Sequence, residues 1–114
     1  MLKLLVQQHY FDAIKSGQKT VEGRLNKPRY NDLVIGMQLQ FEGLEKEVVT
    51  CVIMGINRYP DFASMLAAEG VEAMLPGVAS LQEGVKLYES FPGYKQDVQQ
   101  VGALAIRIRV IKSA

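Results

Sequence analysis

The stretch GQKTVEGRL, residues 17–25, places three charged side chains within six residues of each other. These side chains are Lys19, Glu22 and Arg24, and residues 20–25 have the composition of a β-strand. In an ideal strand Glu22 and Arg24 share one face, whereas Lys19 lies on the other. Lys19 joins the other two only if the strand begins or bulges near Lys19.

The three charges have two interpretations from spacing alone. In the first, Glu22 and Arg24 form an ion pair that contributes little at a surface. In the second they form a polar site, in which Arg24 holds a phosphate or orients Glu22 by a two-pronged contact. Lys19 would then act as a point charge, or as a base if burial lowered its pKa. Glu22 would accept a hydrogen bond from an exocyclic amine or act as general base to a water.

The rest of the sequence predicts strands and helices in an irregular order. The apolar periodicity predicts strands at 3–6, 20–25, 36–41, 48–56 and 101–111, and helices at 8–16, from 60–61 onward and within 79–89. This order indicates an α+β fold with an antiparallel or mixed sheet, not a regular βαβ repeat. The long segments 48–56 and 101–111 are suited to curling into a small barrel.

The composition indicates one globular domain over residues 1–114. The chain is 48% apolar and 22% charged, which argues against disorder. No apolar run approaches the length of a membrane span, and the opening MLKLLV is too short for a signal peptide, so a cytoplasmic protein is expected. With one cysteine and one histidine, the sequence supports neither an internal disulfide nor a Cys/His metal site, and no cofactor is expected.

The net charge of +1 hides an uneven distribution along the chain. Residues 1–30 carry +4, residues 31–97 carry −6 and residues 98–114 carry +3. If the two basic ends meet in space, they form one positive face that attracts phosphates or another anionic partner. Alternatively, the charges scatter around the surface.

A longer pattern around the opening stretch resembles a known family. The pattern F-x-x-I-x-x-G-x-K-T-V-E-x-R is similar to the ASCH domain family, and so are the turn and strand at Gly36 and the last strand from Gly102. The residues of the pattern in this chain are Phe11, Ile14, Gly17, Lys19, Thr20, Val21, Glu22 and Arg24. The resemblance covers essentially the whole chain. It implies a small PUA-like β-barrel with two or three flanking helices.

The resemblance also implies a function for the motif. ASCH domains are proposed to bind RNA, and some members cleave RNA. One bacterial branch hydrolyses acetylcytidine with a lysine that activates a threonine three residues later, assisted by a glutamate from the helical region. Lys19 matches that lysine, but the threonine position is Glu22, and Glu69 and Glu72 are both candidates for the assisting glutamate.

Further binding residues are expected in the loops. Tyr30 and Tyr59 lie in the contexts NKPRYND and INRYPDF, where either ring would stack on a base or pack the edge of the core. Lys27, Arg29 and Arg58 are suited to phosphates, although such loops are also commonly solvated without a role.

We therefore expect a module that binds RNA or a modified nucleoside in a cleft around Lys19, Glu22 and Arg24. The expected partner is RNA or a nucleotide-like small molecule, with no membrane and no metal. The alternatives are an amidohydrolase acting on acetylated cytidine, or a ribonuclease, using Lys19 and Glu22. A protein-interaction module without a ligand is the third class.

Overall fold

The computed structural model describes residues 1–113 and contains one five-stranded mixed sheet. The strands are β1 (Lys3–Leu5), β2 (Val21–Leu25), β3 (Gln38–Glu42), β4 (Val48–Tyr59) and β5 (Ala103–Ser113). The helices are α1 (Gln8–Ser16), α2 (Phe62–Glu69), α3 (Val71–Met74), α4 (Leu81–Glu89) and α5 (Tyr94–Val101), with a 3-10 helix η1 (Pro28–Tyr30). The expected α+β class is confirmed.

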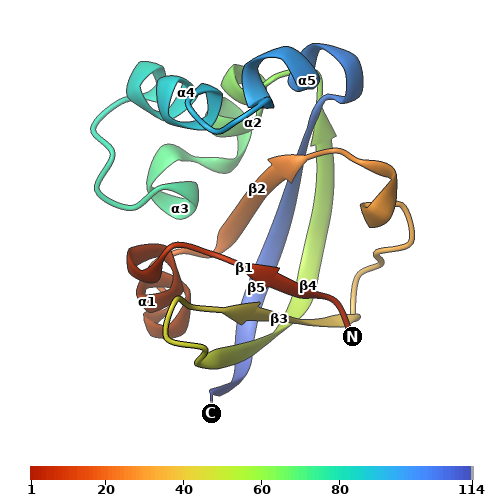
Figure 1. Cartoon of the computed structure of the whole chain (residues 1–114), viewed down its shortest axis with the longest axis vertical. Coiled ribbons are helices and arrows are strands. Elements are labelled where there is room, and N and C mark those ends of the chain that lie inside the picture. Colours follow the sequence, from red (N-terminus) through yellow and green to blue (C-terminus); the bar gives the residue numbers. More distant parts are fainter. Residues whose placement is uncertain (114) are drawn as a thin grey trace.

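The strands follow the order β1-β3-β4-β5-β2, in which β1 pairs parallel with β3 and the other pairs are antiparallel. The long strands β4 and β5 run through the molecule, and α2, α4 and α5 gather at one end of them (Figure 1). Irregular pairing at Thr50/Cys51 and Ile53/Gly55 interrupts the ladder between β4 and β5, and such bulges increase the local twist and bend a strand. The sheet therefore curls into a half-barrel.

The two edge strands, β1 and β2, approach each other without forming a ladder. A side chain joins them instead, because Arg24 Nη2 donates a hydrogen bond of 2.9 Å to the Leu5 carbonyl. We call this junction between β1 and β2 the seam. The seam leaves backbone groups of both edge strands without a neighbouring strand.

Two apolar clusters hold the fold together. The first fills the curled sheet and includes Phe11, Phe41 and Ile53, all at most 2% exposed. The second lies between the sheet and the helices and includes Met65 and Tyr88. Helices α2 to α5 therefore form a separate layer over β2 and β5, and the seam lies under the edge of this layer.

The last strand starts later than the apolar pattern predicts. The expected strand 101–111 begins at Ala103, because α5, which was not predicted, includes Val101. Gly102 makes the turn between them with φ of 78°, and a Cβ there would lie 2.6 Å from the Tyr59 carbonyl oxygen. Only a glycine fits this position without strain.

Two general features bear on function. No helix among residues 1–113 is long and apolar enough to cross a membrane. In the same residues, no three His, Cys, Asp or Glu side chains lie together in a way that would hold a metal ion.

Candidate functional site

The seam contains a cavity of about 180 Å³. Its polar side is formed by Lys19, Glu22, Gly23 and Arg24. Four aromatic side chains complete much of the wall: Tyr10 from α1, Tyr88 from α4, Phe91 from the turn after α4 and Tyr94 from the start of α5. We call this the seam cavity.

Local backbone structure brings the charged motif to the cavity. Gly17 ends α1 in a left-handed conformation, with φ of 84°, and Lys19 N–H then donates to the Ala13 carbonyl. The strand β2 begins only at Val21, so Lys19 precedes the regular alternation of the strand. The Lys19 side chain therefore lies on the same side of the strand as Glu22. This arrangement is the one expected from the sequence if the strand begins near Lys19.

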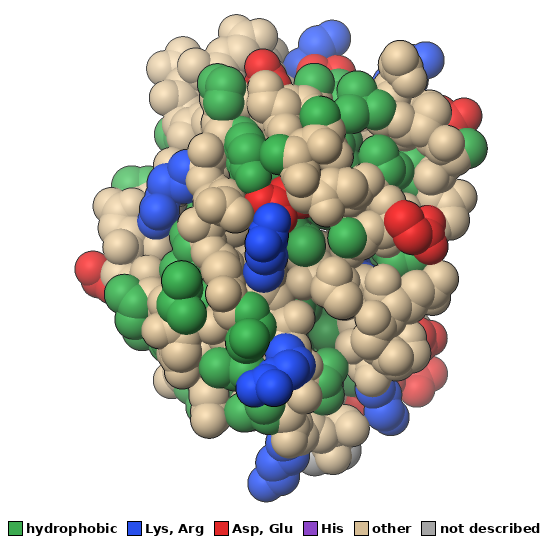
Figure 2. All heavy atoms as spheres, turned by 180° about the vertical axis from the view of Figure 1, so that it is seen from behind, with side chains coloured by type: hydrophobic (Ala, Val, Ile, Leu, Met, Phe, Trp, Pro, Cys, Tyr) green, Lys and Arg blue, Asp and Glu red, His purple; other side chains and the backbone are tan. Residues whose placement is uncertain are grey.

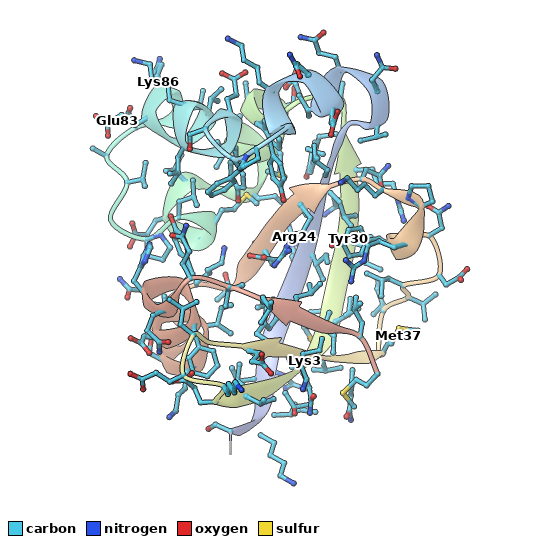
Figure 3. The ribbon with its side chains drawn as sticks, in the orientation of Figure 1. Lys3, Arg24, Tyr30, Met37, Glu83 and Lys86 are labelled. Carbon is cyan, nitrogen blue, oxygen red and sulfur yellow. The ribbon has the colours of Figure 1, made fainter. Side chains whose placement is uncertain are left out.

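Lys19, Glu22 and Arg24 form one ion network. Lys19 Nζ lies 3.3 Å from Glu22 Oε1, and Arg24 Nε lies 2.7 Å from Glu22 Oε2. The side chains of Lys19 and Glu22 are only 2% and 8% exposed, and that of Arg24 is 20% exposed. Figure 3 marks Arg24 between β2 and β1. The network is therefore desolvated on one side and open to the cavity on the other.

The hydrogen bonds define the protonation state of Lys19. Its Nζ donates to the carbonyls of Val21 (2.7 Å) and Met74 in addition to facing Glu22. Three acceptors require three N–H groups, so the side chain is an ammonium. Burial lowers the pKa of Lys19, and the charge of Glu22 acts in the opposite direction.

Glu22 is held as a carboxylate. Burial by itself would raise its pKa, but the charges of Lys19 and Arg24 and their hydrogen bonds outweigh burial and lower the pKa below its ordinary value. Both oxygens already accept from cations, which makes Glu22 a weak general base. An ionised carboxylate still has free lone pairs, so it can accept a further hydrogen bond from a ligand.

Several polar groups at the cavity have no partner of their own. The hydroxyls of Tyr10, Tyr88 and Tyr94 make no hydrogen bond within residues 1–113, and Arg24 uses only Nε and Nη2. Burial raises the pKa of all three tyrosines, and the charge of Glu22 raises each further. The hydroxyls are therefore protonated and can donate.

The backbone of Gly23 adds a donor and an acceptor. Ile108 N–H donates to the Thr20 carbonyl and Asn26 N–H to the Gly102 carbonyl, which identifies the residues of β2 that face β5. Since an antiparallel strand alternates, the N–H and C=O of Gly23 point away from β5 and into the seam. A Cβ at Gly23 would overlap the Tyr88 hydroxyl and lie 2.8 Å from Met74 Cε. Glycine is thus required for the tyrosine to reach the cavity.

Other predicted binding residues lie outside the cavity. Tyr30 is 4% exposed and packs in the core of the curled sheet, with the Arg29 guanidinium 5.1 Å from its ring centre. Lys27 is exposed, and Arg58 Nε donates to Asn26 Oδ1 over 3.2 Å, so Arg58 lies beside the same loop. A role for these four residues stays a prediction.

The candidate glutamates also lie elsewhere. Glu69 accepts hydrogen bonds from Asn57, Tyr59 and Arg107, and Glu72 accepts one from the Gly77 N–H. Neither lines the seam cavity. The Tyr59 hydroxyl donates to Glu69, and Tyr59 does not line the seam cavity, so its role in stacking on a base stays a prediction.

The sequence analysis did not identify the aromatic walls. Three of the nine aromatic residues fall within residues 88–94, a concentration that could have drawn attention to them. Their position over β2 depends on how α4 and α5 dock on the sheet, which the sequence does not reveal.

The curled mixed sheet and the helices packed on it are consistent with an α+β PUA-like fold. The chain belongs to the ASCH domain family, which it matches over residues 4–112. No curated protein matches the chain significantly.

Solved structures agree with this assignment. A hypothetical protein designated PH0355 is 35% identical with a TM-score of 0.87, covering 96% of this chain and 98% of that one. Protein PF0455 from Pyrococcus furiosus is 27% identical with a TM-score of 0.76, covering 97% of each chain. The ASCH protein from Zymomonas mobilis is 21% identical with a TM-score of 0.66; the match covers 97% of this chain and 70% of that one, and shows a shared fold.

Proposed function

We propose that this chain binds one nucleobase in the seam cavity, presented by RNA or by a free modified nucleoside. The observation that carries the proposal is the set of unpaired hydrogen-bonding groups around an aromatic-walled cavity. No fully buried side-chain nitrogen or oxygen within residues 1–113 lacks a hydrogen-bond partner, so the hydroxyls without a partner are ones that reach the cavity. Groups left open in a concave, partly apolar site therefore favour a ligand that completes them.

The size of the cavity favours a single base. Pockets for drug-sized ligands measure about 300–1,000 Å³, and the seam cavity of about 180 Å³ is smaller. Aromatic side chains hold unstacked bases by stacking, which tolerates different bases because each has a π-face. Tyr10, Phe91 and Tyr94 supply such rings at the wall.

The polar groups suit the edge of a base. Gly23 offers an N–H and a C=O from one residue, Arg24 offers further N–H donors and Glu22 offers acceptor lone pairs. A base edge carries the complementary arrangement of carbonyl oxygens, ring nitrogens and exocyclic amines. The network of one anion and two cations also leaves a net positive charge beside the cavity, which attracts an anionic nucleotide.

The geometry favours binding over hydrolysis or RNA cleavage. Glu22 occupies the place of the threonine used by the acetylcytidine-hydrolysing branch, and its lowered pKa makes it a weak base. The three N–H groups of Lys19 are all directed at acceptors. Neither residue is free to activate a nucleophile in this arrangement.

Calorimetric titration with cytidine, N4-acetylcytidine, uridine, adenosine and guanosine tests binding. We expect saturable binding of at least one nucleoside, weakened about 2- to 10-fold by Tyr94→Phe, because one hydrogen bond contributes roughly 0.5–1.5 kcal/mol. The matched control is Tyr59→Phe, whose hydroxyl lies outside the cavity and whose removal should leave affinity unchanged. Equal affinities for all three proteins, or no binding of any nucleoside, would overturn the proposal.

A separate assay addresses the enzymatic alternative. We expect no acetate release from N4-acetylcytidine by the native protein. Turnover that is lost in both Lys19→Ala and Glu22→Ala, with folding intact by circular dichroism, would replace binding with an amidohydrolase activity.

A further inference from the structure

A second hollow lies behind the seam cavity, between the end of α1 and the outer part of β5. It measures about 350 Å³ and includes Lys15, Thr20 and Arg109 in its lining. Lys19 lines both hollows, so the two adjoin at the segment that carries Lys19. We call the second hollow the rear groove.

The rear groove is positive and carries no acidic side chain in its lining. Lys15 and Arg109 are exposed and take part in no ion pair within residues 1–113. Lys112 follows on the same strand and is likewise exposed. Lys15 comes from the basic first part of the chain and Arg109 from the basic last part, so the fold brings the two basic ends together here.

The surrounding surface extends this charge. Figure 2 shows basic side chains following one another down the middle of the face opposite to that of Figure 1. Of the basic residues of β5 within residues 1–113, Arg107 is the one that forms an ion pair, through a 2.8 Å contact of its Nε with Glu69. The cations beyond it, toward the end of β5, are available to a partner.

The edge of β5 contributes a backbone donor. The ladder between β2 and β5 ends at the bond from Ile108 N–H to the Thr20 carbonyl, because α1 and its end take the place of a longer β2. By the alternation of the strand, the N–H of Val110 faces the same side as that of Ile108, and Val110 lines the groove. Main-chain N–H groups are common ligands of phosphate oxygens.

We propose that the rear groove binds the phosphodiester backbone of a single RNA strand. This inference rests on the proposed function and deepens it, because it makes RNA, and not a free nucleoside, the physiological ligand of the seam cavity. The cations of the rear groove bind phosphates without reading sequence, and the seam cavity, which adjoins the groove at Lys19, receives one base.

The test compares a double variant with a matched control. Fluorescence anisotropy of a labelled 12-nucleotide single-stranded RNA is measured between 50 and 200 mM salt for the native protein, for Lys15→Gln/Arg109→Gln and for Lys86→Gln/Lys95→Gln. Single-strand binding falls with salt by a slope of roughly 0.7 per phosphate contact. The groove variant should therefore lose about 1.4 of the slope and bind RNA about tenfold more weakly, or worse, at 50 mM salt. The control, which removes two exposed charges from α4 and α5, should match the native protein.

Nucleoside titration of the same proteins separates the two proposals. Unchanged nucleoside affinity together with the lost slope supports both. Nucleoside binding with a slope that the groove variant does not change, or changes no more than the control, overturns the rear groove alone. Absence of nucleoside binding overturns the seam cavity instead. Binding of the groove to phosphatidylserine vesicles but not to RNA would reassign it to a membrane surface.

Discussion

At the scale of single residues, the molecule places a carboxylate between two cations beneath a cavity. Burying such a network carries a desolvation penalty that its internal attraction barely offsets, so a buried ion pair is weak evidence of stability. Removing one partner is nevertheless strongly destabilising, because the remaining charges are left uncompensated. Glu22 is the partner on which both cations depend.

Glu22→Gln should therefore lower the free energy of unfolding by about 3 kcal/mol, since it leaves Lys19 and Arg24 facing each other without an anion. Urea denaturation at neutral pH measures the change. The matched control is Glu45→Gln at an exposed position, where a change within about 0.5 kcal/mol is expected. A loss no larger than that of the control would show that the ion network contributes little to the free energy of unfolding.

The acid limb of the stability curve tests the same network by titration. The pKa of Glu22 is lower in the folded protein than its ordinary value, so its contribution is present above the unfolded pKa of about 4.3 and is lost as pH falls through the folded pKa. The difference in unfolding free energy between native protein and Glu22→Gln should consequently shrink below about pH 4. Other carboxyls titrate in both proteins and cancel. A difference that stays constant from pH 7 to pH 3 contradicts the assignment.

Residue spacing could predict the charged trio but not its surroundings. The pattern Lys19, Glu22, Arg24 identified a site as soon as the strand was allowed to begin after Lys19. The carbonyl of Met74, which accepts from Lys19, comes from 55 positions away. No local pattern reports such a contact, and the same holds for the Tyr88 hydroxyl over Gly23.

At the scale of elements, the seam between β1 and β2 is the feature that creates the cavity. A continuous ladder there would pair the Gly23 backbone and fill the space. Arg24 instead holds the edges with one side chain, leaving room above for α4 and for the segment between α4 and α5. The strands were largely predictable because their apolar alternation is local, whereas α5 was missed because it relies on only Tyr94, Val98 and Val101 for its buried face.

Gly23→Ala tests how closely the helical layer approaches β2. The added methyl would overlap the Tyr88 hydroxyl, so we expect a loss of about 1–3 kcal/mol in unfolding free energy and loss of nucleoside binding. Gly55→Ala in β4 is the matched control, because the three atoms nearest to its new methyl all belong to the exposed Arg107 side chain, which can move. Tyr88→Phe should restore part of the stability of Gly23→Ala. Equal effects at the two glycines would argue against the close approach.

At the scale of the whole molecule, two hollows share Lys19 and differ in character. The seam cavity is aromatic with a buried ion network, and the rear groove is basic and open. The uneven charge along the chain left two alternatives, one positive face or scattered charges, and Lys15 and Arg109 line the same groove. The sequence could not predict the groove itself, because its shape depends on where β2 stops beside β5.

The binding of a base in the seam cavity is the central claim, and the five tyrosines provide its most direct test. Protein labelled with ¹³C at its tyrosine rings would be titrated with the nucleoside that binds best, and the ring resonances followed by NMR. We predict shifts at Tyr10, Tyr88 and Tyr94, with Tyr30 and Tyr59 unchanged. Shifts confined to Tyr30 and Tyr59, or none at saturating nucleoside, would contradict a nucleobase site in the seam.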